Sequence, residues 1–571
     1  MAPNQTFIKS LLILALLFTS LNAFKPLCID DTVYHYHAQQ IAEQPLHPYG
    51  FRLFWHDRPQ PAVQVLSPVM MQYWWAIAIR IFGEHPFLWK LWMFPYALLL
   101  VFALHSLLRR FAHGHATLLT WMIVISPVFL PSFNLMHDVP VTALTLGAIV
   151  IFLRGFEVSS YGLIALSGLI AGIAGQTKYT GLIGPVVMMV YAFIFRKAWL
   201  GIFAGTVAGT VFVLWEIFIF LSSGQSHFLA QSHTFGSVHL IAKYFYLAWP
   251  LLTLMGAVGP AMLLLALVAL RASKRMILVC AVSLILGYLL IALMPAAYQA
   301  LAASPLTAQE RFTLPGLIFS AYGMAFTATM GVVIWRLTRI GKGLSAGVRY
   351  WRRSREEWFL VGWLVIEIVA YFGLSPFPAV RRVLGLTVVL TLITGRLAAR
   401  TARTPQTRAL VRKIVFGGMA LGLVFYAVDF RDAYVEKTAA ESAAQSSLDL
   451  SRSQISDRGS PGVLNQKVTV WYIARWGFQY YAERAGMKPV LPDESHFQPG
   501  DLLAISDGPY LTEPLAQHLS KYRLEPVTEL VFGDRFPLAT MLGYYNTGIP
   551  VHHQAGARRI VRIYRIVKSG Q

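Results

Sequence analysis

The sequence has few charged residues and few cysteines. Asp, Glu, Lys and Arg together make up 13% of its 571 residues, whereas 56% of the residues are hydrophobic. A soluble domain typically carries about 25% charged residues, so this composition excludes both a single water-soluble enzyme and a disordered chain. The two cysteines, Cys28 and Cys280, cannot form a disulfide framework or a CxxC metal site.

Several well-known nucleotide-binding and catalytic motifs are also absent from the sequence. No GxxxxGK[ST] segment occurs, which excludes a P-loop ATP motor, and no GxGxxG segment opens a strand–turn–helix unit. No Ser/His/Asp triad can be drawn. The basic residues lie at the ends of apolar runs and form no nucleic-acid-binding motif, so nucleic acid is not an expected partner.

Long apolar runs fill the first three quarters of the chain. About 20 apolar residues in a helix cross a bilayer, so the sequence predicts an all-α polytopic membrane bundle of about 13 transmembrane helices. The first run is interpreted as an uncleaved helix rather than a signal peptide, because only Lys9 precedes its apolar part and no clean A-x-A site follows. The predicted spans are 7–24, 89–108, 116–134, 139–154, 161–177, 179–195, 199–221, 249–271, 276–298, 313–335, 357–375, 383–401 and 411–430.

Lys and Arg favour one side of this predicted bundle. The connections on that side carry 21 of them, against 9 on the other side. The positive-inside rule therefore places the N-terminus in the cytoplasm and the C-terminus outside. Residues 1–430 hold 32 basic and 13 acidic residues, and residues 431–571 hold 16 and 14. Most of the net charge of +21 is thus a topology signal and an attraction to anionic lipid.

The chain divides into a membrane part and a smaller outer part. Residues 1–430 form the predicted transmembrane domain, whose long first outer loop, 25–88, contains the interfacial aromatic stretch VMMQYWWAIAIRIF. Shorter outer loops are expected at 222–248 and 296–312. Residues 431–460 are Ala/Ser-rich and predict a linker or a short helix. Residues 461–571 predict a small extracytoplasmic α/β domain, with strands at VTVWYIA, PGDLLAIS and RRIVRIYRIV and a helix at RWGFQYYAERAG.

Acidic residues are scarce in the membrane part, so each one is a candidate for function. Asp30 and Asp31 follow the first span, and adjacent carboxylates repel, which favours a raised pKa and a role as base for one of them. Asp138 lies in a short outer turn that is predicted on the same face of the membrane. Helix capping is the alternative interpretation at all three positions.

Basic residues on the outer side break the positive-inside pattern and are candidates for binding a phosphate. Lys178 interrupts apolar sequence in GQTKYTGLIGP, where it either reaches the lipid headgroups or neutralises a phosphate. Three further basic residues are expected on the same side and are candidates for neutralising the phosphate: Arg311, Arg381 and Arg382.

Histidines beside the acid pair raise the possibility of a divalent metal. His35 and His37 follow Asp30 and Asp31 closely enough to share a metal with them, although such spacing is also common on a helix surface. Tyr34 and His137 are further accessory candidates because they lie next to the acidic positions. His227, His233 and His239 in the second outer loop are spaced by six residues, which fits no zinc pattern.

These segments together resemble the GT-C glycosyltransferase superfamily. More narrowly, the sequence is similar to bacterial proteins grouped with protein O-mannosyltransferases and aminoarabinose transferases (glycosyltransferase family 39 type). The resemblance covers roughly residues 7–400. It is carried by IDDTVYHYHA, LSPVMMQYWWAIAIRIFGEHPFLWKL, SFNLMHDVPVTALTL and GQTKYTGLIGP, and WGFQYYAERAG looks like the outer domain of bacterial members. The chain departs from the family at Leu66-Ser67-Pro68, where many members carry a basic residue, and Arg58 or His56 is a possible substitute.

The resemblance implies a function and roles for particular residues. It implies that a sugar passes from a polyprenyl-phosphate donor to a hydroxyl or amine of a lipid, glycan or protein, outside the bacterial inner membrane. Asp30, Asp31 and Asp138 match the family's acids and Lys178 its lysine, while Arg381 or Arg382 matches its arginine loosely. No cofactor is certain from the sequence, and a divalent metal is possible. The alternatives are a lipid-linked-sugar flippase or transporter, for which Glu216 and Glu367 within apolar spans are thin support, and a polysaccharide polymerase or ligase.

Overall fold

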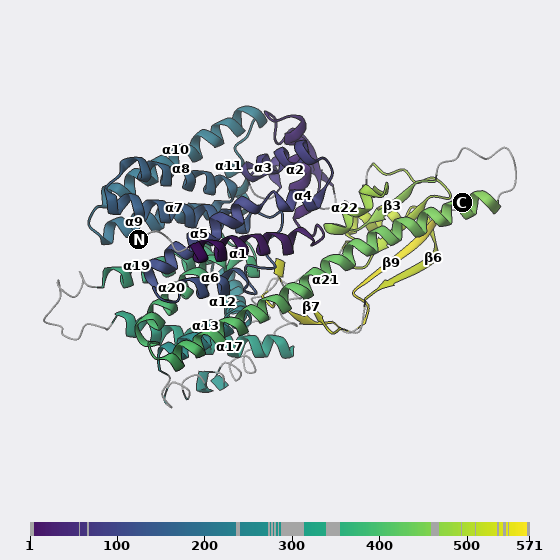
Figure 1. Ribbon diagram of the computed structural model, residues 1–571. Helices are drawn as coiled ribbons and strands as arrows, with labels where there is room; N and C mark the ends of the chain where they lie inside the picture. Colours follow the sequence, from purple (N-terminus) through teal and green to yellow (C-terminus); the bar gives the residue numbers. More distant parts are fainter. Residues whose placement is uncertain are drawn as a thin grey trace.

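A computed structural model of the protein is a helical bundle joined to a small sheet domain by one long helix (Figure 1). It describes residues 5–567 except for 56–57, 66–67, 236–239, most of 272–312, 339–353 and 458–467, and short gaps at 493, 509, 534–535, 541–543, 546–547 and 555.

The described helices indicate a multi-pass membrane protein. Seven of them are long and apolar enough to cross a bilayer, and the bent pair α12 (Leu240–Val258) and α13 (Pro260–Ala269) gives an eighth candidate. The seven are α4 with α5 (Pro86–Leu91 and Phe94–Phe111), α7 (Asp138–Val158), α10 (Ala198–Ser223), α17 (Leu314–Thr338), α19 (Arg355–Leu374), α20 (Leu384–Thr401) and α21 (Pro405–Asp457). Three shorter apolar helices are α1 (Gln5–Ala23), α8 (Tyr161–Thr177) and η2 with α9 (Tyr179–Leu182 and Ile183–Ile194).

The expected number of about 13 spans is not confirmed. The predicted span 116–134 is helical only over α6 (Ala116–Val124), and the chain then turns through 125–137 to reach α7. Pro127 and Pro131 explain the break, since proline lacks the amide hydrogen that an interior helical residue donates. The predicted span 276–298 and the loop 296–312 fall mostly or wholly outside the described residues.

The segment predicted as the first outer loop, residues 25–88, folds over one end of the bundle (Figure 1). It contains α2 (Asp31–Glu43), the antiparallel strands β1 (Arg52–Phe54) and β2 (Pro59–Pro61), η1 (Ala62–Gln64) and α3 (Met70–Phe82). The helix α3 is the aromatic stretch predicted to lie in the membrane interface, and its Trp74 ring stacks on Trp92, with ring centres 5.0 Å apart. The described part of the second outer loop includes α11 (His227–Phe235).

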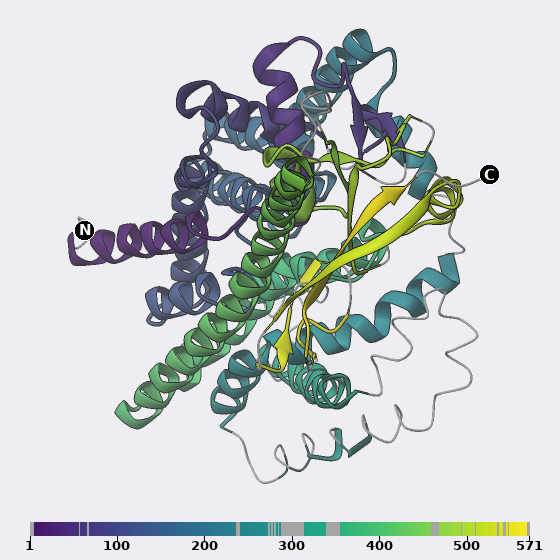
Figure 2. The same cartoon turned by 90° about the vertical axis from the view of Figure 1, so that its right-hand side faces the viewer.

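The helix α21 corrects the expectation of a linker at 431–460. It runs without interruption for 53 residues, from Pro405 to Asp457. The sequence contains no glycine or proline between Gly422 and Gly459, so nothing breaks the helix after it leaves the apolar region. At 1.5 Å per residue, α21 is about 80 Å long, and Figures 1 and 2 show it passing from the bundle along the whole sheet domain.

The small C-terminal sheet predicted from the sequence is present. Its five strands are ordered β4-β3-β5-β9-β6, with β3 parallel to β4 and β5, and β9 antiparallel to β5 and β6. The strands are β3 (Val470–Ile473), β4 (Lys488–Pro489), β5 (Leu502–Ser506), β6 (Arg523–Phe532) and β9 (Arg559–Val567). The helix α22 (Gly477–Arg484) packs between α21 and α2, α23 (Glu513–Leu519) follows β5, and the short strands β7 (Leu538–Ala539) and β8 (His552–His553) pair separately.

Candidate active site

Four of the candidate residues meet where several loops close one end of the bundle. Asp30 immediately precedes α2, and Asp138 is the first residue of α7. Lys178 lies between α8 and η2. Arg381 belongs to η4 (Val380–Arg382), the single turn that leads into α20. Segments that are distant in sequence therefore each contribute one charged side chain to the same place.

These four side chains form a continuous chain of buried ion pairs. Arg381 Nη1 lies 2.5 Å from Asp30 Oδ2 and 3.7 Å from Asp138 Oδ2, and Lys178 Nζ donates to Asp138 Oδ1 at 2.5 Å. All four residues are less than a tenth exposed. Asp30 makes no side-chain capping bond to α2, so the capping interpretation is wrong at that position. Burying charges is costly unless they are paired, and such clusters mark functional sites more often than other buried positions.

The site has more positive than negative charge. Arg382 lies next to Arg381 in η4, and in the described part of the chain it forms no ion pair, while its guanidinium carbon lies 5.0 Å from the centre of the Phe377 ring. Burial and the charge of Arg381 lower the pKa of Arg382. Arg381 and Lys178 pair with the carboxylates of Asp30 and Asp138, and Arg382 adds a third basic side chain to the site. An anion bound beside Arg382 would balance the site.

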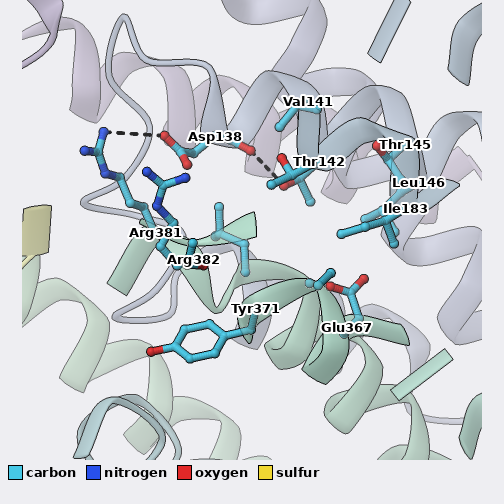
Figure 3. A pocket seen from close by; sticks show the side chains of 15 residues that line it. Asp138, Val141, Thr142, Thr145, Leu146, Ile183, Glu367, Tyr371, Arg381 and Arg382 are labelled. Atoms are coloured by element: carbon cyan, nitrogen blue, oxygen red, sulfur yellow. Dashed lines mark hydrogen bonds and ion pairs between the residues drawn. The ribbon is translucent and has the colours of Figure 1, made fainter. Parts of the chain in front are cut away.

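A cavity opens beside this chain of charges. It has about 70 Å³ of free volume, and Figure 3 shows Asp138, Arg381 and Arg382 at one end of it and Glu367 at the other. Its walls combine hydroxyl-bearing and apolar side chains. The remaining lining residues are Val141, Thr142, Thr145, Leu146, Thr180, Ile183, Ala370, Tyr371, Ser375, Leu384 and Gly385. Asp30 and Lys178 are not in the lining but touch lining residues through their ion pairs.

Asp31 belongs to a different set of contacts from Asp30. Its Oδ2 accepts from the Cys28 amide at 3.1 Å and lies 3.7 Å from Lys90 Nζ. Burial raises the pKa of Asp31, and the charge of Lys90 acts in the opposite direction. Lys90 also donates to the carbonyl of Lys25 at 2.7 Å, so Asp31 and Lys90 together hold the loop that ends at Asp30.

The accessory candidates are packed against aromatic rings. Tyr34 stacks on His137 with ring centres 4.2 Å apart, and His35 stacks on Trp89 at 4.6 Å. His37 meets Tyr49 edge-on. Burial lowers the pKa of both His35 and His37 to about 3, so both imidazoles are neutral at neutral pH. No group of three His, Cys, Asp or Glu side chains suited to a metal ion occurs among the described residues.

The two acids within apolar helices have different surroundings. Glu216 accepts hydrogen bonds from Ser226 Oγ at 2.6 Å and from the Phe228 amide at 3.1 Å, which fixes the start of α11. These bonds tie Glu216 of α10 to the start of α11. Glu367 accepts from Trp363 Nε1 at 3.0 Å and lines the cavity.

Several residues of the site were not singled out from the sequence. Lys25 forms a fully buried ion pair with Asp429 of α21, and Tyr545, from the C-terminal region, contacts Lys25 and Asn134. Lys90 could have been predicted as a buried functional or structural residue, because it is a lysine within an apolar run. Nothing in the sequence around Tyr545 distinguishes it from the other tyrosines. Arg311, His56 and Leu66-Ser67 lie outside the described residues, and Arg58 lies within them.

The fold and the site define a multi-pass membrane protein with a buried, net-positive charge centre at one end of its helical bundle.

No protein-family model and no curated protein match the sequence. Among solved structures, the chain is similar to ArnT from Cupriavidus metallidurans in the apo state, with 13% identity over 98% of this chain and 97% of that one, and a TM-score of 0.40. A second structure of that ArnT, bound to undecaprenyl phosphate, gives 14% identity, 98% of both chains and a TM-score of 0.44.

Proposed function

We propose that this protein is a membrane glycosyltransferase that moves a sugar from a polyprenyl-phosphate donor to an acceptor hydroxyl or amine on the extracytoplasmic side of the bacterial inner membrane. The observation that carries the proposal is the buried chain Asp30–Arg381–Asp138–Lys178 with the additional cation of Arg382, at the rim of a cavity between membrane helices. The resemblance of the sequence to GT-C enzymes supports it independently of that geometry.

The excess of cations suits the leaving group of such a reaction. When the bond between the sugar and the phosphate breaks, the phosphate oxygen takes the electron pair and needs a nearby cation rather than a proton donor. Arg381 and Arg382 line the cavity where this charge would develop. Lys178 does not line the cavity but pairs with Asp138, which does. Cations that are already fixed in place stabilise such a charge without reorganising.

Asp30 is the proposed base. Its carboxylate takes the proton of the acceptor while the acceptor oxygen or nitrogen bonds to the anomeric carbon from the side opposite the phosphate, so the configuration inverts. Arg381 contacts both Asp30 and Asp138 and would hold the base at a fixed place relative to the phosphate. Asp138 keeps its bond to Lys178 and balances the two arginines.

Transfer of a radiolabelled sugar tests the proposal. Membranes containing the protein are incubated with polyprenyl-phosphate sugars and with membrane lipid, glycan and protein fractions as acceptors. Label in an acceptor supports the transferase. Lipid that crosses between leaflets without any product supports a flippase, and chain growth on a lipid-linked glycan supports a polymerase or ligase.

Arg382→Gln is expected to raise the donor KM about tenfold, because one charge-assisted hydrogen bond to the phosphate is lost. The kinetics of labelled-sugar transfer measure this effect. Arg154→Gln is the matched control, since that arginine is 69% exposed and lies near the other end of α7. A donor KM that is unchanged in the Arg382 variant would remove this residue from the phosphate site.

Donor binding is expected to weaken as the pH rises above 7. Burial and the charge of Arg382 lower the pKa of Lys178 to about 7, so its cation is present below that pH and is lost above it. A bound phosphate favours the charged form and moves the midpoint upward. Lys178→Arg stays charged, so its donor affinity is expected to be flat between about pH 6 and 9. Equal pH slopes in the two proteins would contradict a role for the lysine charge.

A further inference from the structure

Tyr545 comes from the C-terminal region of the chain but lies among the loops that carry the candidate site. Its hydroxyl accepts hydrogen bonds from Lys25 Nζ at 3.1 Å and from Asn134 Nδ2 at 2.9 Å. The same oxygen lies 3.7 Å from Cys28 Sγ. The residue is 3% exposed, so water does not compete for these contacts.

The other end of Tyr545 contacts Arg381. The Tyr545 carbonyl accepts from Arg381 Nη2 at 3.5 Å, and the Arg381 guanidinium carbon lies 5.6 Å from the centre of the tyrosine ring. A cation at this distance from an aromatic ring is attracted to it. Tyr545 therefore limits where the guanidinium can move while it bonds to Asp30.

Three segments converge on this one side chain. Residues 25–30 end at Asp30, residues 131–138 end at Asp138, and η4 carries Arg381. We propose that Tyr545 is a positioning residue of the active site, which sets the relative placement of Asp30, Asp138 and Arg381. This inference rests on the proposed function, because it concerns the geometry of the same charge centre.

The helix α21 binds residues that lie close to Tyr545 in the sequence. The Thr540 amide donates to Asp432 Oδ2 at 2.6 Å, and the Thr540 hydroxyl lies 3.3 Å from Asp429 Oδ1. The Tyr544 amide donates to the Thr540 carbonyl at 2.9 Å, and Arg558 forms an ion pair with Asp432. Hydrogen bonds to α21 thus anchor Thr540, five residues before Tyr545.

The expected effects follow from which contacts each substitution removes. Tyr545→Phe removes the acceptor shared by Lys25 and Asn134 but keeps the ring and carbonyl beside Arg381, and we expect kcat to fall about tenfold. Tyr545→Ala also removes the ring, and we expect kcat to fall about a hundredfold, because small misplacements of reacting groups have effects of this size. In Tyr545→Phe the donor KM is expected to change much less than kcat, because the ring and the carbonyl beside Arg381 are kept.

Tyr544→Phe is the matched control for a purely structural effect. The Tyr544 hydroxyl is buried and donates to the Pro127 carbonyl, and it contacts none of the four charged residues. Melting temperatures in detergent are measured for all variants. Equal losses of kcat in Tyr544→Phe and Tyr545→Phe, or wild-type kcat in Tyr545→Ala, would overturn the inference.

A second measurement does not depend on the reaction. Phenylglyoxal labels accessible arginines, and mass spectrometry quantifies labelling of Arg381, whose side chain is 5% exposed. Labelling is expected to rise at least severalfold in Tyr545→Ala and to stay near wild type in Tyr545→Phe and Tyr544→Phe. Unchanged labelling in Tyr545→Ala overturns the inference. Increased labelling in a protein without transferase activity overturns the proposed function alone.

Discussion

Asp30→Asn is expected to lower kcat for sugar transfer about a thousandfold while the protein remains in the membrane in normal amounts. A positioned base contributes about 10²- to 10⁴-fold to such reactions, and an amide cannot take up the proton of the acceptor. The substitution keeps the size of the side chain and an oxygen that can accept from Arg381 Nη1, which lies 2.5 Å from Asp30 Oδ2. The donor KM is therefore expected to change much less than kcat.

Initial rates with a labelled donor measure this effect, and immunoblots of washed membranes measure the amount of protein. Asp449→Asn is the control, because that aspartate is 60% exposed on α21 and lies outside the bundle. Full activity in Asp30→Asn would exclude Asp30 as the base. If Asp138→Asn alone abolished transfer, the role of base would pass to Asp138.

Lys25→Met is expected to lower the free energy of unfolding by about 3–5 kcal/mol. Lys25 and Asp429 form an ion pair in which both side chains are 0% exposed. Removing the lysine leaves the carboxylate of Asp429 buried without its cation, and it also deprives the Pro131 carbonyl and the Tyr545 hydroxyl of a hydrogen-bond donor. The cost comes mainly from the uncompensated charge.

Thermal unfolding of the purified protein in detergent measures this loss. The double variant Lys25→Met/Asp429→Leu is expected to recover most of it, since an apolar pair of similar volume often replaces a buried ion pair at little cost. Lys437→Met is the surface control. Lys437 is 35% exposed, pairs with Glu441 at 3.8 Å and lies 5.7 Å from the centre of the Tyr481 ring, and its loss is expected to cost about 1 kcal/mol. Similar melting temperatures for Lys25→Met and Lys437→Met would contradict the expectation.

The sequence identified four members of the charge centre because each one breaks a local pattern. Asp30 and Asp138 are acids at the ends of apolar runs, and Lys178 and Arg381 are cations on the side that lacks them. The topology implied by the positive-inside rule placed all four on one face. Their pairing could not be predicted, because Asp30 and Arg381 are 351 residues apart and their contact depends on how the helices pack.

Other features left no local signal in the sequence. The Ala/Ser-rich segment after residue 430 has the composition of a linker, yet it continues α21, because contacts with α22 and with the sheet compensate for its low hydrophobicity. Tyr545 is one of 25 tyrosines, and only the fold places its hydroxyl beside Lys25. The span expected at 116–134 was misjudged because hydropathy is insensitive to the prolines that end α6.

The position of Tyr545 has a consequence for the biogenesis of the protein. Tyr545 follows Lys25 by 520 residues, so the ribosome makes the two partners at opposite stages of synthesis. A nascent chain that lacks Tyr545 already holds Asp30, Asp138, Lys178 and Arg381, but its Lys25 ammonium lacks the Tyr545 hydroxyl as a hydrogen-bond acceptor. The contacts of Tyr545 with Lys25, Asn134 and Arg381 can therefore form only after nearly the whole chain has been made. Arg381 thus acquires its contacts with Tyr545 last, long after the two acids that it pairs with have been made.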